Sequence, residues 1–194
     1  GSSGLAITND ANFGDFKPDL FWVSPRSRAD NKVFIDIARG VTKRVKANSA
    51  DPEDTDSTAQ ITFETDGFDL DTTDVNFNGS GSTYVAWQWK TQGGAGSSNT
   101  DGSINTITTS VNQTSGISIN TYTGTGSNAT VGHGLGAVPK MIIIKDRTNT
   151  ESWIVYHEAV GNDGNVYLNL TNAKATQAIF QDTTPTSSVF SLGG

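Results

Sequence analysis

Short apolar runs recur along the whole chain, and each is bounded by glycine, asparagine, aspartate or proline. The runs are rich in β-branched and aromatic residues, a composition that is typical of strands. Two other stretches, residues 37–50 and 171–180, could form a helical turn, although their helical periodicity is weak. The pattern therefore predicts nine strands, at residues 18–24, 31–37, 59–65, 83–90, 117–123, 140–146, 152–158, 165–170 and 188–192.

Residues 91–116 interrupt this pattern with a polar sequence that is rich in glycine, serine, threonine and asparagine. Within it, residues 104–111 have the alternation expected of one strand. Polar segments of this composition commonly connect domains. We therefore expect residues 91–116 to be a polar linker with one possible strand and to mark a domain boundary.

The two halves of the chain share a pattern at a spacing of 121 residues. At this spacing PDLFWVSPRSRADNKVFID (18–36) aligns with PKMIIIKDRTNTESWIVYH (139–157), and both indicate a strand, a polar turn and a second strand. Farther along, DGFDL (66–70) resembles SVFSL (188–192) at a spacing of 122 residues. Similarity at a long, nearly fixed period indicates tandem copies of one structural unit.

These observations predict an all-β, mainly antiparallel protein built from two tandem β-sandwich-like modules with little helix. We place the first module at residues 1–90 and the second at residues 117–194, on either side of the polar linker. Comparison of the copies predicts that the first module lacks its opening strand and the second its closing strand. The one methionine is Met141, so we expect the chain to be a segment of a longer repetitive protein.

Charge and composition argue against several classes of function. Twenty Asp and Glu against 13 Lys and Arg give a net charge of −7, so the chain has no general attraction to nucleic acid or to anionic membranes. No apolar run approaches the roughly 20 residues of a membrane span. The absence of cysteine excludes disulfides and thiolate zinc sites.

Both histidines, His133 and His157, lie near a glycine-rich stretch that could suggest an active site. The repeat argues against this, because His133 corresponds to Asn12 and His157 to Asp36 in the other copy. Neither histidine therefore belongs to the basic design of the module. We expect no catalytic residue in this chain.

Aromatic side chains raise the alternative of sugar binding. In the predicted strand 83–90, Trp87 and Trp89 share one face, where they could form a stacking platform or anchor a buried core. We expect both to be mostly buried. Strand alternation places Trp22, Trp153 and His157 on a wetter face, opposite their core neighbours. These three residues are the ligand-binding candidates.

One acidic stretch, residues 66–82, resembles part of a calcium loop. Asp74, Asn76 and Asn78 followed by a glycine imitate the first half of an EF-hand loop, whereas Val85 stands where its bidentate glutamate is expected. Oxygen-rich loops between strands can still hold calcium, and the candidate ligands are Asp69, Asp71, Asp74, Asn76 and Asn78. The alternative is a solvated Asn-Gly turn that joins two strands. No other cofactor is expected.

Several long strings carry a resemblance to a known family. They are YVAWQWK, SNTDGSI, SINTYTGTGSNATVGHGLGAVPKMIIIKDR, SWIVYH and TTPTSSVFSLGG within residues 84–194, and FKPDLFWVSPRS (16–27) in the first half. Together they resemble an uncharacterised β-rich tandem-repeat domain of tail-fibre-like structural proteins of marine bacteriophages. The resemblance implies a virion or fibre component that recognises a receptor, and it brings no established catalytic residues.

We therefore expect a non-enzymatic structural and adhesion module of a phage fibre or similar extracellular appendage, located in the virion or outside the cell. Its expected partners are other copies or neighbouring fibre segments, because open sheet edges recruit strands, and a host-surface glycan. Nucleic acid and membrane insertion are not expected. One alternative is a discrete, calcium-dependent lectin. A remote alternative is a glycan depolymerase, which requires two carboxylates facing each other across a groove.

Overall fold

Antiparallel strands make up nearly all of the regular structure in the computed structural model, which describes residues 4–10, 12, 14–56 and 60–194. The helical elements α1 (Val75–Asn78) and η2 (Ala178–Phe180) are single turns. The strands are β1 (Leu5–Ile7), β2 (Leu20–Pro25), β3 (Val33–Asp36), β4 (Lys43–Lys46), β5 (Asp54–Thr55), β6 (Ile61–Glu64), β7 (Gly67–Leu70), β8 (Tyr84–Trp89), β9 (Thr108–Asn112), β10 (Ile117–Thr121), β11 (Ala129–Gly132), β12 (Met141–Ile144), β13 (Ile154–His157), β14 (Val166–Tyr167) and β15 (Val189–Leu192).

The predicted all-β, mainly antiparallel fold with little helix is confirmed. The helical turn suggested for residues 37–50 is wrong, because β4 occupies its centre. In the stretch 171–180 the structure has only the 3₁₀ turn η2 at its end. Among the described residues, no helix is long and apolar enough to cross a membrane.

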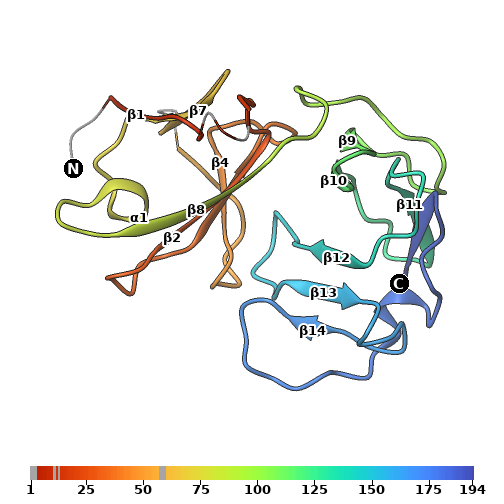
Figure 1. Ribbon diagram of the computed structural model, residues 1–194. Helices are drawn as coiled ribbons and strands as arrows, with labels where there is room; N and C mark the ends of the chain where they lie inside the picture. The colour runs from red at the N-terminus through yellow and green to blue at the C-terminus, as the bar shows by residue number, and fades with distance from the viewer. Residues whose placement is uncertain (1–3, 11, 13, 57–59) are drawn as a thin grey trace.

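The first module is a β-sandwich, seen on the left of Figure 1. Its larger sheet has the order β5-β4-β3-β2-β8, and its smaller sheet the order β1-β7-β6. Alternate side chains of β2 and β3 point toward the smaller sheet, and because these side chains are apolar, they form one wall of the core. The core between the sheets consists of Phe21, Val23, Val33, Ile35, Ile61, Phe63, Phe68, Leu70 and, from α1, Phe77.

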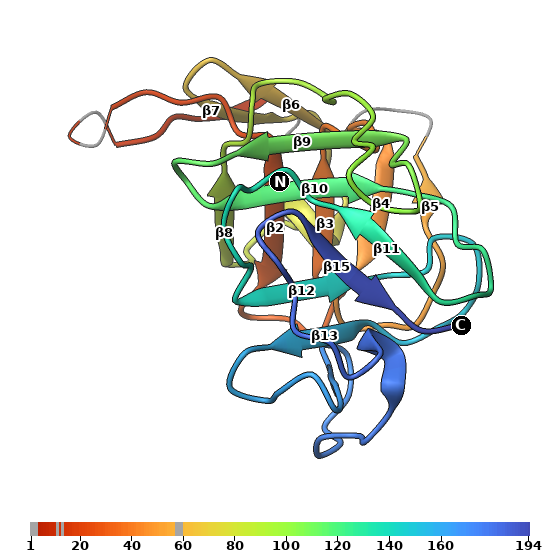
Figure 2. The same ribbon diagram turned by 90° about the vertical axis from the view of Figure 1, so that its right-hand side faces the viewer.

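The second module, on the right of Figure 1, has three small sheets with the orders β12-β13-β14, β11-β15 and β10-β9. Figure 2 looks onto this module and shows β11 and β15 running side by side. Its core lies between the sheet of β11 and β15 and strand β12 of the three-stranded sheet. The buried members are Ile104, Ala129, Val131 and Phe190, and Tyr122, Ile142, Ile144 and Leu192 pack against them.

The pairing registers show that the two modules are built alike. In the β2–β3 ladder Leu20 lies opposite Asp36, and in the β12–β13 ladder Met141 lies opposite His157, 121 residues later. The other pairs of the two ladders agree at the same spacing. The structure therefore has two tandem modules, while the residue limits assigned to them from the sequence stay a prediction.

Backbone hydrogen bonds repeat at the same spacing. The side-chain oxygen of Asn48 accepts from the backbone N–H of Lys32 at 2.9 Å, and that of Asn169 accepts from Trp153 at 3.0 Å. Each asparagine thus links the residue before a strand, β3 or β13, to the segment after the next strand, β4 or β14. An unpaired N–H at this point would cost free energy, which explains why both copies contain an asparagine here.

The polar connector is packed against the first module. Asp19 is fully buried at the start of β2, and one of its oxygens accepts from the backbone N–H of Thr91 at 2.8 Å and from that of Gly93 at 2.9 Å. The Thr91 hydroxyl in turn lies 2.5 Å from that of Ser110 on β9. The strand expected within residues 104–111 is present as β9, and polar groups fasten the connector to the first module, while Ile104 of the connector packs in the core of the second.

The outer face of the first module's larger sheet is covered by the second module. Trp153 is only 5% exposed and packs on Phe34, with ring centroids 5.5 Å apart. Its indole N–H donates to the carbonyls of Lys46, the last residue of β4, at 2.9 Å and of Ser49 at 3.2 Å. The predicted wetter face is therefore wrong for Trp153: the larger sheet is apolar on both sides, and part of its second face is the contact between modules.

An ion-pair network crosses the same contact. Both oxygens of Glu53 accept from Arg147 of the second module at 2.8 Å, and Arg39 of the first module donates to Glu53 at 3.2 Å. Arg39 also donates to Asp36 at 2.6 Å, so each buried charge has an opposite partner. Burial favours a higher pKa for Glu53, but Arg147 and Arg39 outweigh it and hold this pKa below its ordinary value.

Loss of Trp153 should weaken the contact between the modules and lower the stability of the chain, whereas loss of an exposed tryptophan should have a smaller effect. We expect Trp153→Ala to lower the free energy of unfolding by about 3–5 kcal/mol, as large-to-small core changes do. Trp87→Ala removes one partly exposed ring contact and should cost no more than about 1.5 kcal/mol. Urea unfolding followed by fluorescence measures both variants. Equal losses would contradict the assignment of Trp153 to the contact between modules.

Candidate functional site

A row of aromatic rings crosses the outer face of the first module. Trp87 on β8, Trp22 on β2 and Phe34 on β3 lie directly opposite one another in the strand registers. The ring centroids of Trp22 are 4.9 Å from Trp87 and 4.7 Å from Phe34. With Trp153 of the second module, these residues form what we call the aromatic row: Trp87, Trp22, Phe34 and Trp153.

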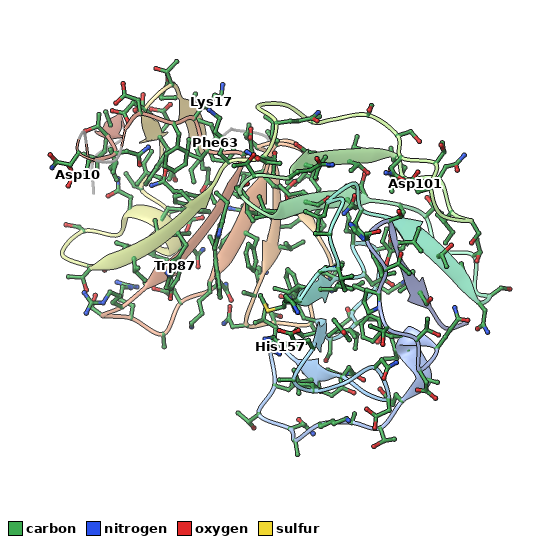
Figure 3. The ribbon with its side chains drawn as sticks, turned by 45° about the vertical axis from the view of Figure 1, so that its right-hand side comes forward. Asp10, Lys17, Phe63, Trp87, Asp101 and His157 are labelled. Atoms are coloured by element: carbon green, nitrogen blue, oxygen red, sulfur yellow. The ribbon has the colours of Figure 1, made fainter. Side chains whose placement is uncertain are left out.

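The aromatic row is buried at one end and open at the other. Trp153 is 5% exposed, whereas Trp87 is 42% exposed at the edge strand β8. Figure 3 shows Trp87 on the first module. The prediction that Trp87 is mostly buried is therefore wrong, because the opposite face of β8, with Tyr84 and Ala86, packs on the core of the first module. Trp89 is half-buried on the same face as Trp87.

The two tryptophans proposed as exposed ligand-binding residues have other positions. Trp153 is in the contact between modules and cannot stack on a ligand. Trp22 is half-buried, because Phe34 and Trp87 lie close to its ring. The sequence shows which residues share a face of a strand, but not which face is covered. Trp87 thus takes the exposed role that the sequence assigned to Trp153.

A cleft of about 330 Å³ opens beside Trp22, between the two modules. Its walls combine apolar side chains with amides and one cation, and they come from both modules: Trp22, Lys32, Ala47, Asn48, Leu168, Asn169, Leu170 and Thr171. The Trp22 indole nitrogen is buried, and among the described residues it has no hydrogen-bond acceptor.

The combination of an exposed indole ring and a cleft that mixes apolar side chains with amide groups suits a neutral, hydroxyl-rich ligand. The face of a ring such as Trp87 offers stacking surface, and amide groups such as Asn48 and Asn169 both donate and accept hydrogen bonds. The sequence did not identify this cleft, since its walls come together only when the modules pack. The repeat of Asn48 at Asn169 was the one signal for these residues.

A second hollow of about 540 Å³ is lined by residues of β12, β13 and β14, among them Ile144, Ile154 and Tyr167. Asp146 and Glu151 are among its lining residues, beside Tyr167 and Gln177. Asp146 accepts hydrogen bonds from the backbone N–H groups of Thr148 and Asn149, at 2.7 and 3.0 Å. These bonds, together with one from the Asn149 side chain, lower the pKa of Asp146. This carboxylate therefore serves the turn between β12 and β13.

His157, the third ligand-binding candidate, lies at the end of β13 in the second module (Figure 3). It is half-buried, and its Nδ1 accepts from the backbone N–H of Ala159 at 3.1 Å. Its counterpart Asp36 accepts from the backbone N–H of Arg39 at 2.8 Å. Both side chains therefore cap the turn after the same strand. The structure does not bring His157 together with the tryptophan candidates in the cleft lining.

Three of the five residues considered for calcium, Asp74, Asn76 and Asn78, have hydrogen-bond partners within the protein. Asp74 begins α1, where one of its oxygens accepts from the backbone N–H and the side-chain amide of Asn76 at 2.8 and 2.7 Å. The second Asp74 oxygen faces the Arg44 guanidinium at 3.4 Å. Asn78 donates to the carbonyl of Thr72 at 3.0 Å. This geometry is a helix cap bonded to a cation, not a cation-binding loop.

The remaining two calcium candidates do not complete a site. Asp69 is part of β7, opposite Thr62, and Asp71 follows that strand. Within the described ranges, no group of three or more His, Cys, Asp or Glu side chains could hold a metal ion. The calcium loop predicted from Asp69, Asp71, Asp74, Asn76 and Asn78 is therefore not formed.

His133 is a buried structural residue in the second module. The backbone N–H of Leu135 donates to its Nδ1 at 3.1 Å, so the neutral ring carries its proton on Nε2, which lies 3.2 Å from the carbonyl of Thr186. Burial lowers the pKa of His133, although the bond to Thr186 partly opposes this. The fold therefore holds this ring neutral.

The pH dependence of stability should report this burial. A lowered folded-state pKa adds stability that is fully present above the unfolded value of about 6.5 and is lost as the pH falls toward the folded value. Urea unfolding at several pH values between about 7.5 and 5 should show this loss, and His133→Gln should flatten it. His157→Gln is the control. Parallel curves for the wild-type chain and His133→Gln would contradict the assignment.

Comparisons with known proteins place the chain in a family without revealing an activity. Searches of curated proteins and of solved structures gave no match. One family model matches residues 3–194, which is nearly the whole chain and includes both modules and the cleft between them. The protein therefore belongs to the family described as a domain of unknown function, DUF7483.

Proposed function

We propose that this chain is a non-enzymatic structural and adhesion module of an extracellular fibre, of the kind found in phage tail fibres. The proposal assigns carbohydrate binding to Trp87 and the adjoining cleft. The aromatic row is the observation that carries it. Its buried end, at Trp153, fixes the second module on the first, and its open end presents the indole ring of Trp87. Between them, Trp22 lines the cleft together with amide groups from both modules.

The assembly half of the proposal is supported by the contact between modules. A fibre segment must transmit force without its modules turning against each other. The buried Trp153 ring and the paired charges of Arg39, Glu53 and Arg147 provide a contact that favours one arrangement. A rotation would remove Arg147 from Glu53 and leave this buried carboxylate with Arg39 as its remaining partner, which is destabilising.

The adhesion half is supported by the exposure of Trp87. A large aromatic side chain at the edge of a sheet is energetically more favourable when covered, and large side chains of this kind are enriched in binding surfaces. The acidic net charge of −7 favours neutral or cationic partners over sulfated or phosphorylated ones. We therefore propose neutral surface glycans as the ligand class, bound without calcium.

Trp87→Ala should weaken glycan binding without unfolding the chain. Loss of one stacked ring corresponds to an affinity about fivefold to tenfold lower, whereas Trp87→Tyr retains a ring and should lose less. A glycan array selects the ligand, and calorimetry with and without a chelator measures each variant. Equal binding by the wild-type chain and Trp87→Ala, or turnover of the glycan, would contradict the proposed site.

A further inference from the structure

Strand β12 lies at the edge of its sheet, whereas the equivalent strand of the first module does not. In the part of the chain that the structure describes, the orders are β12-β13-β14 and β5-β4-β3-β2-β8. Since β12 corresponds to β2 at the spacing of 121 residues, the position next to β12 is the one that β8 occupies in the first module. The second module thus has an unpaired edge where the first has a strand.

The backbone alternation defines which groups of β12 face this edge. The carbonyl of Lys140 accepts from the backbone N–H of Glu158, so residues 140, 142 and 144 bond toward β13. The N–H and C=O groups of Met141 and Ile143 therefore point away from β13. In the first module the counterpart of Ile143 is Trp22, which pairs with Trp87 of β8.

The side chains next to this edge are apolar and exposed. Met141 is 55% exposed, Ile143 is 38% exposed, and Val138 just before the strand is 45% exposed. In the first module the ring of Trp87 covers the equivalent of Ile143. Exposed apolar residues beside an unpaired edge are a typical strand-binding surface, because both the ladder bonds and the apolar contacts become available to an added strand.

We infer that the edge of β12 binds an extended segment with the sequence pattern of β8, in which a valine and two tryptophans on one face alternate with tyrosine, alanine and glutamine on the other. The segment pairs antiparallel to β12. By the register of the first module, the position equivalent to Trp89 lies opposite Met141, and that equivalent to Trp87 lies opposite Ile143. This inference deepens the assembly part of the proposed function and does not depend on glycan binding.

The other end of the repeat gives independent support for added strands. Strand β11 of the second module is flanked by the connector, where Ile104 bridges to Val131 in parallel, and Val131 is fully buried. The corresponding strand of the first module is β1, whose Ile7 is 37% exposed. In both cases, a strand that one module leaves open is covered in the other module by a neighbouring segment.

The test uses a labelled peptide of residues 82–91, STYVAWQWKT, titrated against the whole chain. We expect saturable binding of one peptide per chain, measured by fluorescence anisotropy. Amide hydrogen exchange should slow about tenfold or more at Met141 and Ile143, while Ile142 and Ile144, already bonded to β13, should change little. Absence of binding, or protection confined to other strands, would overturn the inference.

Two control variants and one control peptide make the result specific. Ile143→Lys should weaken the peptide about tenfold or more, and Ile107→Lys, which alters a 60% exposed apolar residue of the connector, should not. A peptide with Trp87→Pro lacks one ladder N–H and should not bind. Equal affinity of both lysine variants would overturn the assignment to β12.

Sedimentation of the chain without peptide separates this inference from the assembly proposal. Self-association that Ile143→Lys abolishes would support the edge as an assembly contact. Self-association that persists unchanged in Ile143→Lys and in excess peptide would leave the assembly proposal standing and overturn the role of β12.

Discussion

The insertion of the Trp153 ring between the modules is the contact on which the rest of the structure depends. The ring lies on Phe34 at a centroid distance of 5.5 Å, and its N–H donates to the carbonyls of Lys46 and Ser49. A buried indole requires an acceptor, and the end of β4 and the turn after it supply one each. Because the same contact brings residues 168–171 beside Trp22, the cleft exists only when Trp153 is in place.

The ion pairs at this contact determine arrangement more than stability. Taking charges out of water costs free energy that their mutual attraction only partly returns. Glu53, held by Arg39 and Arg147, therefore adds little to the stability of the correct arrangement, yet a displaced module would remove Arg147 and leave Glu53 with Arg39 alone. The tryptophan supplies the burial, and the charges disfavour alternative arrangements.

Much of the fold could be predicted from the sequence, because strand period and repeat are local signals. The spacing of 121 residues aligned Leu20 with Met141 and Asp36 with His157, and the structure pairs these residues in the same way. The assignment of faces failed for a physical reason. Alternation shows which residues share a face of a strand, but where both faces are apolar, as in β2 and β3, it cannot show which face is covered. The sequence alone therefore could not show that Trp153 is covered while Trp87 is exposed.

The candidate site was less predictable, since it is a product of packing between distant segments. Asn48 and Asn169 were recognisable as repeated residues, but their common role in holding a strand entry gave no indication that they line one cleft. The acidic loop failed differently: the spacing of Asp74, Asn76 and Asn78 imitates calcium ligands, yet the same spacing caps a short helix. An Asx side chain bonds the N–H two residues on in either case.

The repeat also explains why equivalent positions have diverged. The contact between the modules is not symmetric, so each copy contributes a different set of residues to it. The first module uses its face for Trp22 and Phe34 and receives Trp153, whose counterpart in the first module is the polar Lys32. In the second module the counterpart of Trp22 is the smaller Ile143, on a face that the first module does not fully cover. The difference between the copies therefore follows from the direction of the contact: one module provides the ring, the other the surface, and the sequence of each copy is fitted to its side.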